Sequence, residues 1–384
     1  MALTNNQALT RQTKCFVKLE STYGELAFPA ATDVLAVLGV PKVTQEDQFV
    51  DSKEIVESRS KPARTWTGVG PGNWNLQVYA RPSGTPGTPP QESALVEAAL
   101  GAKTINADTS VVYAPALVLP SLSLCFREGH TWHFVLGAKV AELKATLTKK
   151  DLVTLDFSGQ CQKVVRAGTS ETVVGSTTNV INLAEGDAAL FDISARVQVG
   201  GENNTAAGYT ITAVDDENDT ITISPALAEA PAAGVAVTGY LPTGSLAGHT
   251  VSGAEGTLTL AGAAVTITGF DGSIANALSP DEDEIAPAGF ITAIDEGTRS
   301  ASGTISARFR RQYAGWFRRA RSQTQGAVVV SAGSAAGKRV GLSLPYAVLN
   351  TPSTDGDEIR RTISVALVGL ASGALENEVT ITYS

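Results

Sequence analysis

The chain has 384 residues, too many for one ordinary hydrophobic core, so its length predicts two or three domains. Charged residues make up 17% of it, below the roughly 25% typical of soluble domains, and the net charge is −9. The acidic balance excludes a protein that wraps nucleic acid, because such proteins carry broad basic surfaces. The low charge indicates that much of the surface is buried against neighbouring subunits, which would also protect the edges of strand-like segments from aggregation.

The first fourteen residues lack the apolar core of a signal peptide, and no run of about 18 apolar residues could span a membrane. We therefore expect a protein made in the cytoplasm without a membrane partner. Three scattered cysteines, Cys15, Cys125 and Cys161, fit free thiols in a reducing compartment better than a disulfide framework.

The N-terminal part begins with a strand pattern in which Cys15, Val17 and Leu19 share one face. Residues 45–64 follow as a long polar segment with little apolar periodicity. Long loops of this kind in a compact domain are commonly functional. Two interpretations remain open: an arm that reaches a neighbouring subunit, or a mobile surface loop.

A strand followed by a helix is the most regular unit of this part. Trp74, Leu76 and Val78 alternate with polar residues, which predicts a half-buried strand. A helix is predicted over residues 92–101, with Thr88 as its cap and Gly101 at its C-terminal end. Strands are then expected at residues 122–126, 132–140, 143–147 and 153–157.

Residues 170–242 have a different sequence pattern, which predicts short strands separated by polar turns. The strands are expected at 196–199, 209–214, 220–224 and 235–240. They predict a small all-β insertion domain. The expected domains are therefore 1–169, 170–242 and 243–384.

The third segment repeats the strand and helix unit of the first. Ile305, Ala307 and Phe309 alternate with polar residues, and a helix with one apolar face follows over residues 313–320. A strand over residues 327–330 comes next. Because only these two helices have a sustained helical period, the fold class is predicted as mainly β, with two similar β-sandwich or barrel domains that each carry one short helix, plus the small β insertion.

No arrangement of residues predicts catalysis or a cofactor. Residues 333–339 are one residue short of a phosphate loop and lead into a strand, not a helix, so a hairpin turn is the better interpretation. His130 and His133 would face opposite sides of a strand, which argues against a zinc site. His249 is the only other histidine, and no nucleophile elbow is present, so we expect no enzyme, no metal and no cofactor.

Two charged clusters are candidate subunit-interface sites. Six arginines lie within fourteen residues: Arg308, Arg310, Arg311, Arg318, Arg319 and Arg321. An acidic loop contains Asp281, Glu282, Asp283 and Glu284. Because arginine forms two-pronged bonds with carboxylates, the two clusters are candidates for salt bridges between subunits. A solvated helix rim and solvated acidic turns are the alternatives, and both remain open.

This organisation resembles a bacteriophage tail tube, or major tail, protein of a long-tailed phage. The resemblance rests on the segment 18–24 followed by a loop rich in proline and alanine, on the strand 75–80 with its helix, and on residues 137–140 before the next strands. Because the tube unit occurs twice, it resembles a duplicated form of a fold that usually occurs once per chain.

The resemblance implies a structural virion protein whose sheets align with those of neighbouring subunits into hollow rings. Rings would stack into the tail tube, through which phage DNA leaves without sequence-specific binding. Two folds per chain imply homotrimeric rings with pseudo-sixfold symmetry. Other implied partners are the tape measure, tail terminator and distal tail proteins. The implied location is the virion tail, after assembly in the host cytoplasm.

Further expectations follow from the tube. An acidic lumen would repel the DNA backbone, and residues 45–64 would reach the next ring. Residues 170–242 would sit outside. The alternative function is a carbohydrate- or cell-surface-binding β-sandwich protein of a phage particle, against which the scarcity of aromatic residues, 6% of the chain, argues.

Overall fold

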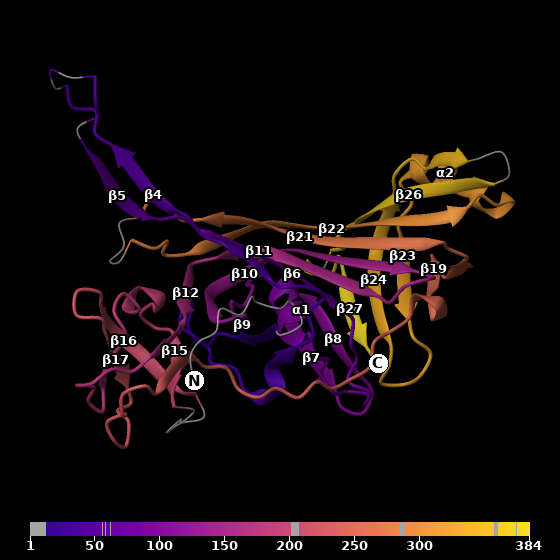
Figure 1. Ribbon diagram of the computed structural model, residues 1–384. Helices are drawn as coiled ribbons and strands as arrows, with labels where there is room; N and C mark the ends of the chain where they lie inside the picture. The colour runs from indigo at the N-terminus through magenta and orange to yellow at the C-terminus, as the bar shows by residue number, and fades with distance from the viewer. Residues whose placement is uncertain are drawn as a thin grey trace.

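A computed structural model describes residues 13–384 except 56, 58, 62, 201–206, 285–288, 357–359 and 374. Within this part the protein is mainly β, with two α-helices, as the sequence predicted. Figure 1 shows a long sheet that runs across the whole molecule, a second layer of strands below it, and a smaller sheet to one side. None of the helices in the described part is long and apolar enough to cross a membrane.

The first half is organised around β10 (Thr131–Thr148), which belongs to two sheets. Its N-terminal part pairs with β9 (Leu122–Glu128) and β12 (Lys163–Ala167), and β1 (Lys14–Leu19) and β2 (Val34–Leu35) extend this layer beyond β9. Its C-terminal part pairs with β11 (Thr154–Cys161), which pairs with β6 (Gly72–Tyr79) and then β3 (Lys42–Thr44). Two register shifts, one between Val135 and Ala138 and one between Val140 and Glu142, accompany the passage between layers, because an extra residue bends a strand.

The second half has a comparable strand in β24 (Val340–Leu349). Its N-terminal part pairs with β23 (Gly326–Ala332) and β27 (Thr380–Tyr383), and β19 (Thr257–Leu260) and β20 (Ala263–Val265) follow beyond β23. Its C-terminal end pairs with β26 (Arg361–Gly369), which also pairs with β22 (Ile294–Arg308) and β25 (Ser353–Gly356). The hairpin of β7 (Gly101–Asn106) and β8 (Ser110–Pro115) from the first half is added to β27.

The two halves meet where β10 pairs with β21 (Gly269–Pro280), which is also the partner of β22. The result is one long sheet in the order β3, β6, β11, β10, β21, β22, β26, β25. Traced through the described residues, the pairings do not return to their starting strand. The sheets are therefore not closed into barrels, and the barrel form of the predicted fold class is wrong.

A single hydrophobic core extends through both halves beneath the long sheet. Helix α1 (Ser93–Leu100) lies inside it, with Leu95, Val96 and Leu100 completely buried. Trp74 and Leu76 reach this core from the first half, and Ile305 and Val365 reach it from the second. Helix α2 (Gly315–Ser322) lies at one end of the molecule and buries mainly Trp316 and Ala320 (Figure 1).

The segment expected as an insertion forms a separate six-stranded sheet in the order β13, β18, β15, β16, β17, β14. Its strands are β13 (Thr169–Glu171), β14 (Val180–Asn182), β15 (Arg196–Val199), β16 (Tyr209–Asp215), β17 (Thr220–Ser224) and β18 (Ala236–Gly239). It packs through a second core on Phe16, Trp132 and Phe134 of the first half. The four predicted strands are confirmed. The division into three domains, and the view that two of them are copies of one fold, stay predictions.

The polar segment 45–64 contributes to a two-stranded hairpin of β4 (Asp47–Asp51) and β5 (Arg64–Val69), called the arm below. Figure 1 shows that the arm extends beyond the body of the molecule. The arm therefore has regular structure that its low apolar periodicity did not predict, because two exposed strands need no buried face.

Two local predictions need correction. Helix α1 begins at Ser93 with Glu92 as its N-cap residue, so Thr88 is not the cap; the predicted C-terminal Gly101 is confirmed, with a φ of 107°. The strands predicted over residues 132–140 and 143–147 are one strand, β10. Its two bulges interrupt the alternation that marks a continuous strand in a sequence.

Candidate functional site

The exposed face of the long sheet carries small polar side chains from both halves. Because side chains alternate along a strand, Trp74, Leu76 and Val78 point into the core while Asn73, Asn75 and Gln77 point outward. On β22 the outward residues are Ser302, Thr304 and Ser306. One row crosses five strands in register: Gln77, Asp156, Lys144, Ser273 and Ser302.

The few charges in the middle of this face are largely engaged. Lys144 Nζ lies 3.2 Å from Glu142 Oε2, and Ser273 donates to Glu142 Oε1 over 2.9 Å. Thr146 donates to Asp271 over 3.0 Å. A face with neutral hydroxyls and amides and few free cations cannot hold phosphate groups strongly, because such binding depends on lysine and arginine.

The two charged clusters lie at opposite ends of one hairpin. Asp281 follows β21 at the point where Pro280 pairs with Ile294, and Arg308 ends β22 at the other end. The separation is about 40 Å, since each of the twelve residues of β21 advances the strand by about 3.3 Å. The acidic loop and the arginines therefore do not meet within one chain.

The acidic end is joined to the arm. Gln48 on β4 donates to Glu282 over 3.2 Å, and the Val69 amide donates to the Gly289 carbonyl over 2.8 Å. Phe49 and Trp66 on the arm are both 46% exposed. This end therefore combines carboxylates with projecting aromatic side chains.

The arginine end is built on α2. Tyr313 stacks on Trp316 with ring centroids 4.5 Å apart, and the Tyr313 hydroxyl donates to the Thr266 carbonyl over 3.2 Å. These contacts fix the apolar side of the helix, so Arg318 and Arg321 point to solvent. Arg319 donates to the Thr324 and Gln325 carbonyls. Among the described residues, none of the six arginines forms an ion pair.

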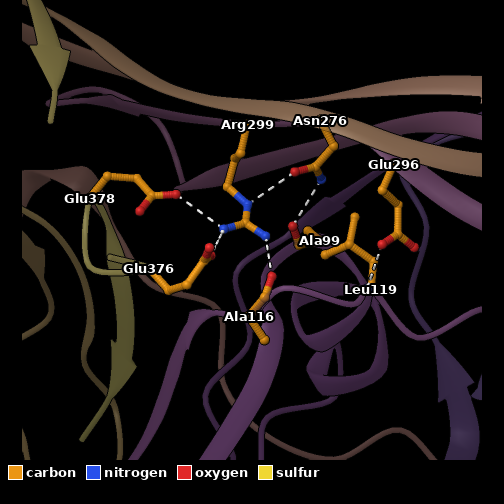
Figure 2. A network of polar contacts seen from close by, with 8 residues as sticks. All are labelled: Ala99, Ala116, Leu119, Asn276, Glu296, Arg299, Glu376 and Glu378. Carbon is orange, nitrogen blue, oxygen red and sulfur yellow. Dashed lines mark hydrogen bonds and ion pairs between the residues drawn. The ribbon is translucent and has the colours of Figure 1, made fainter. Parts of the chain in front are cut away.

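Beneath the sheet, Arg299 joins both halves (Figure 2). Its guanidinium donates to Asn276 Oδ1 over 3.2 Å, to the Ala116 carbonyl over 2.6 Å, and to Glu376 and Glu378 over 2.8 and 3.1 Å. Its side chain is 11% exposed. Because Ala116 belongs to the first half and the two glutamates lie near the C-terminus, this one side chain fixes three segments.

A second buried network centres on Glu92. Its Oε1 accepts from the Arg81 amide over 2.8 Å and from the Tyr383 hydroxyl over 2.7 Å, and Tyr113 donates to the neighbouring Ser93. Burial raises the pKa of the Glu92 carboxyl, since the charged form loses its hydration.

Nothing in the described residues gathers into a catalytic or metal centre. No group of three or more histidine, cysteine, aspartate or glutamate residues in the described part could hold a metal ion. His133 stacks on Phe126 with ring centroids 4.7 Å apart, and burial lowers its pKa to about 4. Cys15, Cys125 and Cys161 are buried free thiols, and burial raises their pKa values, that of Cys161 to about 12.

Residues 196–368 match the family described as phage tail tube protein. This region of the chain is similar to the phage tail tube family. The match begins in β15 of the small sheet and ends in β26, somewhat less than half of the chain. No curated protein matches the chain.

The match to the tail tube family supports a structural protein of the phage tail, and the family is typically non-enzymatic. Self-assembly and contact with other tail components follow at the level of the family. The match therefore makes the charged ends and the polar face candidate assembly surfaces.

The sequence did not indicate Arg299, Asn276 or Glu92 as important residues of this chain. Each lies in a strand or turn without a distinctive motif, and its partners lie between 11 and 291 positions away. For two of them a sequence signal was available. Asn276 and Arg299 lie on the inner face of β21 and β22, where apolar residues are expected, so a polar residue there indicates a buried polar contact.

Proposed function

We propose that this chain is the major tail tube subunit, which forms rings stacked around a lumen through which phage DNA passes on ejection. The observation that carries the proposal is the long sheet. It spans both halves, buries one face, and exposes another that is polar and has few free cations.

In this proposal the exposed face of the long sheet lines the lumen. In the middle of that face three carboxylates, Glu142, Asp156 and Asp271, accompany one ammonium group, that of Lys144. A weakly negative surface of hydroxyls and amides repels the DNA backbone and gives it no site at which to bind, so DNA slides.

Three chains would form each ring. The chain contributes two sets of strands to one sheet, so three copies give six sets and a pseudo-sixfold homotrimer. The expected domains 1–169, 170–242 and 243–384 fit this arrangement. The small sheet packs on Phe16, Trp132 and Phe134, in the layer away from the exposed face of the long sheet, and would therefore lie outside the ring.

Contacts between stacked rings are assigned to the two charged ends. The acidic loop 281–284 and the arm lie at one end of β21 and β22, and the six arginines lie at the other. Rings stacked in the same orientation would bring these ends together as intersubunit salt bridges, with the arm spanning to the next ring. The terminal rings would contact the tail terminator and distal tail proteins, and the lumen would hold the tape measure protein before ejection.

Electron microscopy of the purified protein and of its parent particle, with rotational averaging of end-on views, tests this function. Hollow stacked rings with three chains each are expected. Rings of six chains would retain the tube but remove the two equivalent folds. Particles that never form rings, with no tail built from them, would overturn the proposal in favour of surface binding. Removal of residues 45–64 should shorten or abolish tubes, and tubes of normal length would refute the role of the arm.

A further inference from the structure

A cleft lies between the small sheet and the base of the arm, on the side of the molecule where Figure 1 shows both. Its volume is about 600 Å³, a size usual for sites that bind small ligands. β12 lines it with Lys163 and Arg166, the arm with Asp47, and the turn after β16 with Asp216. Folding therefore gathers charged side chains from three distant segments around one opening.

The outer edge of β12 in this cleft is closed by side chains. Gln45 accepts a hydrogen bond from the Val164 amide over 2.9 Å and donates to the Gln162 carbonyl over 3.0 Å. The carboxylate of Asp192 accepts from the Arg166 amide over 2.7 Å, and the Asp192 amide donates to the Arg166 carbonyl over 2.9 Å. These bonds use the backbone groups with which an added strand would pair. The cleft is therefore preformed and meets a ligand through its side chains.

Both kinds of polar group in the cleft have unused capacity. Within the described residues, neither Lys163 nor Arg166 forms an ion pair. Lys163 Nζ lies 5.0 Å from the centroid of the Phe290 ring, and burial lowers the pKa of this ammonium group. The Asp216 side chain is exposed and accepts none of the described hydrogen bonds. A ligand in the cleft would therefore meet both donors and acceptors.

The balance of charges indicates the class of ligand. The lining holds three carboxylates, those of Asp47, Asp192 and Asp216, and two cations. The excess of carboxylates disfavours phosphate and other anions, and an aliphatic chain would leave charged groups buried without partners. A sugar fits better, because each of its hydroxyls both donates and accepts hydrogen bonds. The C–H face of a sugar ring would pack on apolar side chains of the lining, among them Ile193, which is 49% exposed.

We propose that this cleft binds one neutral sugar unit of an oligosaccharide or polysaccharide. The carboxylates of Asp47 and Asp216 accept from its hydroxyls, and Lys163 and Arg166 donate to them. Because Lys163 covers the Phe290 ring, the sugar packs on aliphatic side chains instead of an aromatic platform, and a single unit should bind weakly, in the millimolar range. This activity goes beyond the proposed tube, and the cleft needs no second copy of the chain.

Ligand-observed NMR of the purified full chain tests the site. The probes are free glucose, galactose, mannose and N-acetylglucosamine, with glucuronic acid and inorganic phosphate as anionic comparisons. Glucuronic acid has the ring of glucose and adds a negative charge. Saturable binding of at least one neutral sugar is expected, with both anions bound more weakly. No saturable binding of any neutral probe, or tighter binding of either anion, would overturn the proposal.

Substitutions assign the bound sugar to the cleft. Asp216→Ala removes an acceptor from an exposed turn and should leave the fold intact, whereas Lys163→Met removes a donor and keeps an apolar side chain on Phe290. Each should weaken the affinity about tenfold or more. Glu217→Ala is the matched control and should leave the affinity unchanged. Glu217 is the next residue of the same turn and is also exposed, but it does not line the cleft.

The outcomes separate this site from the tube. Undiminished binding by both cleft variants, or equal weakening by the control variant, would place the sugar elsewhere and overturn the assignment. Electron microscopy of the same wild-type sample reports ring formation independently. Rings that bind none of the neutral sugars would overturn the cleft and leave the tube. Sugar binding by chains that never form rings would support the cleft and count against the tube.

Discussion

The Tyr383 hydroxyl donates a hydrogen bond to Glu92 over 2.7 Å, although the two residues are 291 positions apart. Tyr383 lies on the last strand, β27, and Glu92 precedes α1 in the first half. The bond is buried, so water cannot replace it. The two halves are therefore joined at the C-terminal end of the chain as well as through β10 and β21.

Loss of this bond should weaken the whole fold. Tyr383→Phe removes the hydroxyl and leaves a buried carboxyl oxygen with one partner fewer, which should lower the free energy of unfolding by about 1–3 kcal/mol. Urea denaturation of the isolated subunit measures this change in the free energy of unfolding. Tyr346→Phe is the control, because the Tyr346 hydroxyl makes none of the described hydrogen bonds, and an equal loss there would contradict the role of the bond.

The Glu92 carboxyl should make the free energy of unfolding decrease as the pH rises. Its pKa is raised in the folded state above the ordinary value of 4.5, so the folded protein holds this proton more tightly than the unfolded chain. This contribution is complete below the unfolded pKa and is lost as the pH rises through the folded pKa. Glu92→Gln should remove it, so the difference in unfolding free energy between wild type and variant should change with pH in that direction. A difference that stays constant from pH 4 upward would refute the assignment.

Substitution of Arg299 should destabilise the fold more than substitution of most other polar residues. Arg299→Met leaves Glu378, 12% exposed, without its cation, and loss of one partner of a buried ion pair costs about 3–5 kcal/mol. Adding Glu378→Gln should recover part of the loss, because the remaining group is then neutral. Arg321→Met on the exposed side of α2 is the control and should change stability by less than about 0.5 kcal/mol. Denaturant titration measures the free energy of unfolding of the three variants. Equal values would show that Arg299 does not hold the three segments together.

Gly159 should tolerate no side chain. A Cβ there would lie 1.9 Å from the Lys139 carbonyl oxygen, which belongs to the backbone of the bulged part of β10. Gly159→Ala should therefore cost about 1–3 kcal/mol or more, as overpacking does. Gly341→Ala, where the nearest atom is 3.4 Å away, is the matched control in another strand. Similar melting temperatures for the two variants would show that β10 can shift to make room.

Ring stacking should be more sensitive to salt than ring closure. Salt bridges between exposed acidic and arginine side chains weaken as ionic strength rises, whereas backbone pairing between strands does not depend on charge. Arg318→Glu with Arg321→Glu should give single rings instead of tubes, and Asp281→Lys with Glu282→Lys added should restore tubes. Lys14→Glu, also exposed, should leave tube length unchanged. Tube lengths measured by electron microscopy at low and high salt would contradict the proposal if they did not differ.

The sequence by itself determined the β class, most strand positions and the two helices. Alternation such as that of Trp74, Leu76 and Val78, or of Ile305 and Ala307, is a local property, since one buried face per strand is enough to produce it. Four of the six strands of the small sheet were predicted for the same reason. The charged clusters were equally visible, because charge can be read residue by residue.

Only the tertiary structure decided which strands are neighbours. β10 pairs with β21 across more than a hundred residues, and no local pattern encodes that choice. Asn276 and Arg299 acquire their structural roles only when folding brings Ala99, Ala116 and Glu378 to them. The placement of the acidic loop and the arginines at opposite ends of one hairpin depends on strand length and register. Periodicity predicts which face of a strand is buried, whereas the partner of that strand is selected by packing summed over the whole core.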